Sequence, residues 1–352
     1  MESKSGAFNR SLIIQDYRIQ TVLILLGRFF FVLKRCVNQF FRSNFAQVII
    51  SFMAISTTQF RLQFIVLLWG FTGVLGKLIQ TEAVPLVWYR VGVASVVLFL
   101  ILRIRKIDLK LNRKDLMLLL GIGGVIGLHW MAFFGAIKVS NVAVALSTLS
   151  TGALFSAFLE PLFFKRKINL SEVILAIVVA GCILLIYNAS PEYWMGIVLG
   201  IICSFLSAFF SVSNGKIHTR FPAQKIMFYE MLGGWMVVCL FLPFFGGFPS
   251  LLEVSWKDLG LLILLGSLFT AYPMIESVSL MKFVSPFTLL LNVNLEPVYG
   301  IILAFLIFGE SEKMTPLFYV ATAIMVLAII VNALLKMRAA RKLRAENQSL
   351  EI

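Results

Sequence analysis

The sequence lacks the motifs and residue clusters on which most enzymes, metal sites and disulfide frameworks depend. It contains four cysteines, scattered singly and without a CxxC pair, at Cys36, Cys182, Cys203 and Cys239. This spacing supports neither a zinc site nor a disulfide framework, and with only His129 and His218 a histidine-built metal site is not expected. Since no GxxxxGK(S/T), HExxH or GxSxG motif occurs, we predict no Walker-type ATP hydrolysis, no enzyme activity and no cofactor.

Charged residues are also scarce, at 14% of the 352 residues, whereas hydrophobic residues reach 60% and the mean hydropathy is +0.93. This composition is far from that of a soluble domain and indicates an integral membrane protein. The apolar runs are long rather than short and alternating, which excludes a barrel of strands and predicts an all-α fold. The net charge of +14 does not indicate a nucleic-acid partner, because the basic residues gather in short loops on one side of the membrane.

Residues 1–60 differ from the rest of the chain and are predicted to form a basic N-terminal extension. Residues 28–42 mix phenylalanines with cations, which is typical of an amphipathic helix lying on an anionic membrane surface. The alternative is a misassigned start, with Met53 as the true first residue. No cleavage pattern marks the segment as a signal peptide, so both interpretations stay open.

Ten membrane-spanning helices are predicted, followed by a basic cytoplasmic tail at 339–352. Their ranges are about 62–79, 85–103, 115–137, 140–164, 169–188, 195–215, 224–245, 257–281, 285–309 and 314–336. The loops at 103–114, 165–167 and 216–225 are rich in Lys and Arg, whereas the opposite loops are mainly acidic. Since positive loops face the cytoplasm, both termini should be cytoplasmic in a multi-pass protein of the cell membrane, most simply a bacterial inner membrane.

A weak internal repeat relates two parts of this array. Residues 140–165 align with residues 285–310 at an offset of 145 positions. At the same offset, LMLLLG at 116–121 aligns with LLILLG at 261–266. Matching polar positions within two such segments predict a transporter built from an internal repeat.

The predicted repeats are residues 61–190 and 191–338, with five spans each. An odd number of spans requires the two halves to cross the membrane in opposite directions. The loop charges agree, because the basic KRK at 165–167 corresponds to the acidic ESE at 310–312. We therefore predict an all-α integral membrane protein with ten transmembrane helices as two inverted five-helix repeats.

The ninth predicted span carries the best candidate site, formed by Glu296 and Asn292. The two residues are four apart and share one helix face. A carboxylate in the membrane core is costly and functional by default, so the pair should face a cavity and bind a polar ligand. The structural alternative is that Glu296 caps backbone broken at the neighbouring proline. Ser147 and Thr151 hold the equivalent positions of the first half, where they bind ligand or, as is common, bond to helix carbonyls and neighbouring helices.

Glu276 and His129 are further candidates. Glu276 shares a face with Tyr272 in the eighth span and suits a substrate ammonium or a coupling proton, unless it pairs with another intramembrane charge. His129, with Trp130, falls near the mirror position in the third span. A histidine there suits a proton relay or a ligand contact, and a packing role is the alternative.

Arg90 and its neighbour Tyr89 open the second span. They match Tyr229-Glu230 at an offset of 140, and Glu230 receives less weight because it lies close to its interface. Arg90 suits a substrate carboxylate or a buried glutamate, and snorkelling to the interface is the alternative. In the first span, Trp69 either lines the cavity or only packs.

Three motifs follow each other in a characteristic order: LLWGFTGVLGK with Trp69-Gly70, PLVWYR at 85–90, and LEPVYGIILAFLIFGESEKMTP at 295–316. In this order, over roughly residues 60–338, the chain resembles the EamA-type transporters of the drug/metabolite transporter superfamily. The first half departs from the pattern, with Thr151-Gly152 where the second has Glu-Pro, so the halves need not play equal roles. The resemblance implies a ten-helix transporter, often an exporter, with a central cavity lined by spans 1–4 and 6–9.

Together these observations predict a secondary transporter of small polar or amphipathic metabolites, amino-acid-like or related, that works by alternating access, with export as the expected direction. Its predicted partners are a small-molecule metabolite, the lipid bilayer and a proton or other coupling ion, unless exchange or the substrate's own gradient drives transport. No nucleic acid is expected. A flippase for lipid-linked carriers, a channel and a membrane-embedded enzyme are the alternatives, and the oligomeric state stays open.

Overall fold

Helices account for every regular element in the part of the chain that the structure describes. This computed structural model describes residues 57–165, 167, 170–249, 254–284, 289, 292–293 and 295–350. Residues 1–56 of the predicted extension at 1–60 and most of the stretch at 285–294 lie outside these residues, whereas residues 57–60 belong to the first helix. In chain order the elements are α2 (Thr57–Leu78), α3 (Ala83–Ile104), α4 (Arg113–Val139), α5 (Val142–Leu149), α6 (Gly152–Phe164), α7 (Leu170–Ala189), η1 (Pro191–Tyr193), α8 (Trp194–Ile217), α9 (Ala223–Phe241), η2 (Leu242–Phe244), α10 (Trp256–Gly266), η3 (Ser267–Ala271), α11 (Tyr272–Leu280), α13 (Glu296–Phe308), η4 (Gly309–Glu312) and α14 (Pro316–Leu350).

Seven helical segments of the described chain are long and apolar enough to cross a membrane. They are Thr57–Leu78, Ala83–Ile104, Arg113–Val139, Val142–Phe164, Pro191–Ile217, Ala223–Phe244 and Trp256–Leu280. Val173–Ala189 and Pro316–Asn332 are shorter apolar helices. Many large apolar side chains face outward, among them Leu162 and Leu306 at 73% exposure each, as expected for surfaces that meet lipid.

Local sequence signals determine where several helices begin. Asn112 caps α4 by accepting a hydrogen bond from the Asp115 backbone N–H at 2.8 Å. Ser255 caps α10 in the same way, accepting from Asp258 at 3.1 Å. Such a capping side chain satisfies one of the backbone donors that a helix start leaves unpaired.

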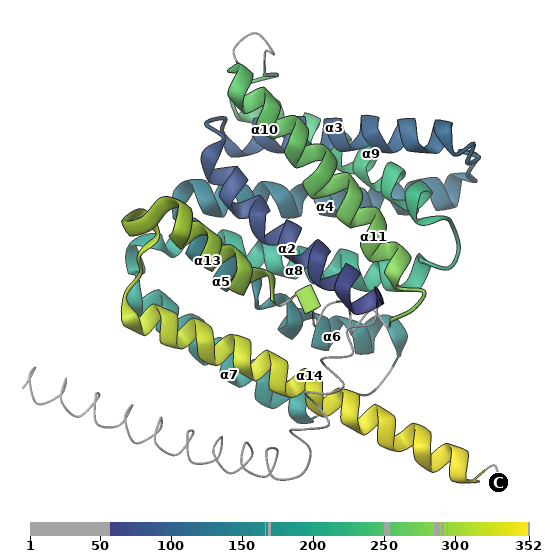
Figure 1. Cartoon of the computed structure of the whole chain (residues 1–352), viewed down its shortest axis with the longest axis vertical. Helices are drawn as coiled ribbons and strands as arrows, with labels where there is room; N and C mark the ends of the chain where they lie inside the picture. Colours follow the sequence, from purple (N-terminus) through teal and green to yellow (C-terminus); the bar gives the residue numbers. More distant parts are fainter. Residues whose placement is uncertain are drawn as a thin grey trace, which may run out of the picture. The chain divides into compact units, whose positions relative to one another are not determined.

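Helices from both predicted repeats pack against each other rather than in separate groups. Helix α4 packs on α8 and α9, α3 packs on α9 and α10, and α5 packs on α8 and α13. Helices α7 and α14 lie side by side, as Figure 1 shows in teal and yellow. Residues 58–352 accordingly form one unit by their contacts.

The contact between α4 and α9 brings backbone against backbone. A Cβ added at Gly123 would lie 2.0 Å from the carbonyl oxygen of Glu230, and one at Gly233 would lie 2.2 Å from that of Leu120. Only glycine permits such an approach, which is a common way for membrane helices to associate. The two glycines therefore allow the backbones of α4 and α9 to touch beside Glu230.

Within the described residues, the helices are interrupted or distorted at three places. Helix α5 ends at Leu149 and α6 begins at Gly152. Thr151, between them, is equivalent at the 145-residue offset to Glu296, where α13 begins. Between α10 and α11 the chain forms a π-helical turn, η3. Such turns are frequent at functional sites.

Candidate functional site

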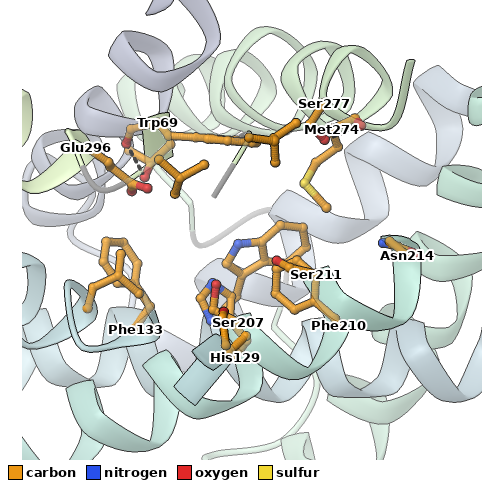
Figure 2. Close-up of a pocket in the computed structure, with 18 of the residues that line it drawn as sticks. Trp69, His129, Phe133, Ser207, Phe210, Ser211, Asn214, Met274, Ser277 and Glu296 are labelled. Atoms are coloured by element: carbon orange, nitrogen blue, oxygen red, sulfur yellow. Dashed lines mark hydrogen bonds between the residues drawn. The ribbon is translucent and has the colours of Figure 1, made fainter. Parts of the chain in front are cut away.

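A cavity lies among helices α2, α3, α4, α5, α6, α8, α9, α11 and α13, whereas none of its lining residues belongs to α7 or α14. It contains about 1040 Å³ of empty space, including the part that opens to solvent. Figure 2 shows two facing walls, one with Trp69, Met274, Ser277 and Glu296, the other with His129, Phe133, Ser207, Phe210, Ser211 and Asn214. A mostly apolar cavity with a few convergent polar groups is typical of a small-molecule site.

Arg90 contributes a fully buried positive charge to the cavity wall. Its side chain is 1% exposed, and its Nε donates a hydrogen bond to Thr270 Oγ1 at 2.7 Å. The guanidinium lies 4.3 Å above the centre of the Trp130 ring, a distance typical of a cation–π contact. Its Nη1 is buried without a hydrogen-bond partner, so a donor is left for a ligand.

The π-helical turn η3 provides the partner of Arg90. Thr270 Oγ1 donates to the carbonyl of Leu265, five residues earlier, at 2.6 Å, and it also accepts from Arg90. Thr270 is fully buried. The break in the α10–α11 segment therefore orients a hydroxyl group that holds the guanidinium in place.

Glu296 contributes the negative charge at the first residue of α13. It lines the cavity and is 7% exposed, and Figure 2 shows it beside Trp69 on the same wall. A Cβ added at Gly70 would meet the Gly300 backbone nitrogen at 3.1 Å, so α2 and α13 cross in close contact there. This crossing brings Trp69 next to Glu296.

Arg90 and Glu296 contribute opposite charges to the lining of one cavity. The two side chains make no direct ion pair among the described residues. Trp69 and Phe133 line the same cavity. A small molecule with an anionic group, a cationic or hydrogen-bonding group and an apolar part fits this arrangement.

His129 also lines the cavity, in the middle of α4. Its Nδ1 lies 2.8 Å from the carbonyl oxygen of Cys203, a distance that fits a hydrogen bond donated by the ring. The ring stacks on Phe133 and meets Phe210 edge to face. The imidazole is thus oriented by α8 and presented among aromatic side chains.

Helix α8 presents a polar stripe that continues the site. Ser207, Ser211 and Asn214 line the cavity at spacings of four and three residues, which places them on one helix face. Asn214 Nδ2 donates to Glu230 Oε2 at 3.1 Å. Glu230 is fully buried behind the cavity wall on α9.

Other sequence-predicted residues lie outside the cavity lining. Asn292 Oδ1 accepts hydrogen bonds from Gln59 at 2.7 Å and from Gln63 at 2.6 Å. Glu276 forms an ion pair with Arg61 near the start of α2. These contacts connect the N-terminal end of α2 to the second half of the chain.

Four more of the predicted residues make structural contacts in this state. Ser147 bonds to Thr322 of α14 at 3.1 Å, and Thr151 donates to Ser204 of α8 at 2.7 Å. Tyr272 is 41% exposed and meets Phe64, whereas Tyr89 is buried and meets Trp88 edge to face.

Sequence reasoning missed Thr270 and the stripe on α8. The stripe had a readable signal, because Ser204, Ser207, Ser211 and Asn214 repeat at helical spacing within an apolar span. Thr270 had no such signal in the sequence, since its role depends on a local π-helical turn.

Within the described residues, no group of three His, Cys, Asp or Glu side chains is placed to hold a metal ion.

Comparisons with known proteins indicate a membrane transporter. A family model described as the EamA-like transporter family matches the chain twice, over residues 56–188 and 194–334. A curated relative from Bacillus subtilis (strain 168), named uncharacterized transporter YdfC, is 24% identical over 233 residues, which are 64% of this chain and 74% of the relative. A solved crystal structure matches with a TM-score of 0.58 at 16% identity, covering 80% of this chain and 99% of that one.

Proposed function

Because the chain belongs to the EamA-like transporter family, we propose that it is a secondary exporter of small amphipathic metabolites, amino-acid-like or related, working by alternating access. The chain is a multi-pass membrane protein and a transporter by family. The opposite charges of Arg90 and Glu296 on one largely apolar cavity carry the proposal. In a bound state Arg90 would hold the anionic group, Glu296 the cationic or hydrogen-bonding group, and Trp69 and Phe133 the apolar part.

We further propose ten membrane-spanning helices arranged as two inverted five-helix repeats. The double match to the family model and the equivalent breaks at Thr151 and Glu296 support this topology. In it, the sixth to tenth spans retrace the first to fifth in the opposite direction, and both termini lie in the cytoplasm of the cell membrane.

The cavity would open alternately to the two sides of the membrane as the halves rock around it. Arg90 and Glu296 would then meet the metabolite from the cytoplasm and release it outside. Either a coupling ion such as a proton, or exchange, would drive this cycle.

A comparison of metabolites in growth medium tests the proposal. Cells that express the wild type, Glu296→Gln or an empty vector are matched for the amount of transporter in the membrane. We expect one metabolite class to accumulate outside only with the wild type, because a glutamine in place of Glu296 lacks the negative charge proposed to bind the cationic group of the metabolite. Glu310→Gln is the matched control, since Glu310 is an exposed carboxylate paired with Lys313 outside the cavity, and it should export like the wild type.

Two outcomes would count against the proposal. If the medium of the wild type matches that of the empty vector, export of common metabolites is wrong, and flipping of a lipid-linked carrier becomes the next hypothesis to test. If Glu296→Gln exports as well as the wild type, the role proposed for Glu296 is wrong although transport stands.

A further inference from the structure

Glu230 is a charged group that the proposed substrate site does not use. It lies on α9 with 0% exposure, and the backbone of α4 presses against its own backbone at Gly123. A carboxylate sealed from water in this way is costly unless something neutralises it.

The hydrogen bonding of Glu230 is incomplete on two atoms. Its Oε2 accepts a hydrogen bond from Asn214 Nδ2 at 3.1 Å, whereas its Oε1 is buried without a partner. Asn214 is 3% exposed, and its Oδ1 is also buried without a partner. Two acceptor oxygens of one contacting pair therefore lack a donor.

No charged side chain of the described residues supplies that donor. Around α9, Asp115 pairs with Arg220 and Glu276 with Arg61, whereas His129 contacts the Cys203 carbonyl and Arg90 bonds to Thr270. Hydrogen bonds to backbone carbonyls are made by Lys225 to Lys110, Tyr229 to Leu109 and Lys138 to Ile79. The Tyr89 ring packs edge to face on Trp88. Asn214 is thus the one polar side chain recorded in contact with the Glu230 carboxylate within this part of the chain.

We propose that Glu230 and Asn214 form the proton-binding site of the transport cycle. A proton on Oε1 would let the acid donate to Asn214 Oδ1 while Asn214 Nδ2 donates to Oε2. A carboxylic acid and a primary amide form such a two-bond pair, and one proton then satisfies both unpaired oxygens. A metal cation would need more oxygen ligands than these two.

The cavity gives the proton a route. Asn214 lines it, as does Ser211 one turn before. Water that enters the cavity would therefore reach the amide that contacts Glu230. The proton would enter Oε1 from the cavity when it is open to one side and leave to the cavity when it is open to the other. This proposal rests on the proposed export function, which it supplies with a coupling ion.

Arg90 and Glu230 occupy equivalent places in the two halves. Each is seven residues beyond the first residue of its helix, Ala83 for α3 and Ala223 for α9. The repeat thus carries a permanent positive charge for the substrate in one half and a titratable acid for the proton in the other.

Infrared spectroscopy of the purified full-length protein, without substrate, tests the site directly. The spectrum of the wild type minus that of Glu230→Gln should contain a carboxylic-acid carbonyl band that disappears as the pH is raised. In Asn214→Leu the band should move to higher frequency, because the acid loses its hydrogen bonds to the amide. Glu310→Gln, which changes an exposed carboxylate, should keep the wild-type band.

Several results would overturn the proton site. These are a band that does not differ between the wild type and Glu230→Gln, a band that persists at every pH, and a titration that follows sodium concentration when NaCl replaces KCl. The substituted glutamine can pair with Asn214 through two amide hydrogen bonds, so Glu230→Gln should fold. If it does not, the frequency shift in Asn214→Leu still decides whether the acid pairs with this amide.

Coupling is tested by repeating the metabolite comparison at two values of medium pH. One coupled proton changes the attainable accumulation ratio by about tenfold per pH unit. Export by the wild type should therefore vary with medium pH, whereas export by Glu230→Gln should not. If Glu230 titrates but the wild type exports nothing, the proposed function is contradicted and the proton site stands. If export by the wild type and by Glu230→Gln depends equally on pH, coupling through Glu230 is contradicted.

Discussion

Arg90 shows how a permanent charge is kept inside an apolar helix array. One donor is used on Thr270, the face of the guanidinium lies over Trp130, and Nη1 is left unpaired. Cation–π contact and a single hydrogen bond offset part of the desolvation cost of the buried charge. Nη1 is the part of the side chain that a ligand can satisfy.

At the residue scale we predict that Arg90→Gln weakens the apparent affinity for the exported metabolite. A hydrogen bond to a charged group contributes about 1.5–3 kcal/mol, so the loss should be about 10- to 100-fold. The measurement is export against intracellular metabolite concentration at matched membrane expression. Lys313→Gln, an exposed cation outside the cavity, is the control, and wild-type affinity in Arg90→Gln would refute the assignment.

Breaks in the helices determine where the polar groups of the site point. The π-helical turn η3 orients Thr270 towards Arg90, and the start of α13 puts Glu296 into the cavity. At the equivalent break of the first half, Thr151 is tied to Ser204 and to the Thr148 carbonyl instead. The two halves therefore use the same kind of break for different purposes.

At the scale of elements, the contact of α4 with α9 predicts a contrast between two glycines on the same helix. A Cβ at Gly123 would clash with the Glu230 backbone at 2.0 Å, whereas nothing lies within 4 Å of one at Gly121. Gly123→Ala should lower stability by about 1–3 kcal/mol, since overpacking costs that much. Gly121→Ala should leave it unchanged or slightly raised.

Thermal unfolding of the two purified variants in detergent measures this difference. The order of the midpoints should be Gly123→Ala below the wild type and Gly121→Ala at or above it. Equal midpoints for both variants would mean that α4 and α9 do not meet through these glycines.

Over the whole molecule, two ion pairs join α2 to the second half at opposite ends of the helix. Arg61, near the start of α2, pairs with Glu276 of α11. Lys77, near its end, pairs with Glu312 at 2.7 Å, and Glu312 also accepts hydrogen bonds from the backbone of Val142 at 3.2 Å and Ala143 at 3.0 Å, where α5 begins. Movement of the halves past each other would have to break these pairs.

We therefore predict different results from exchanging the charges of the two pairs. Arg61→Glu and Glu276→Arg should each impair export, and the double exchange should restore it. The reason is that the pair is partly exposed and that, among the described residues, the two side chains bond to each other. Exchange of Lys77 and Glu312 should not restore export, because a lysine in place of Glu312 would set a positive charge against the positive end of α5.

Export by all six variants at matched expression is the measurement. Full recovery in the Lys77–Glu312 exchange would show that the contacts of Glu312 with α5 do not matter. No loss in any single variant would show that neither pair contributes to transport.

The sequence by itself determined the membrane class, the helical fold and the family. Long apolar runs permit only helices in a bilayer, because every backbone polar group must be satisfied within its own segment. The mid-span polar residues His129 and Glu296 could also be predicted, since polar groups in membrane segments are costly and are seldom without a role. Arg90 could equally be interpreted from the sequence as an interfacial side chain, and only the structure shows it buried. The order of the motifs identified the EamA resemblance, and the family model agrees with it.

Only the tertiary structure decided which of these residues share a cavity. Glu276 and Asn292 look as promising as Glu296 in sequence, yet side chains from α2 satisfy both of them. Glu230 looked interfacial, yet the close approach of α4 seals it from water beside Asn214. Partners of this kind come from helices more than a hundred residues away or from a neighbouring span, and helical periodicity reports the face a residue occupies but not what is packed against that face.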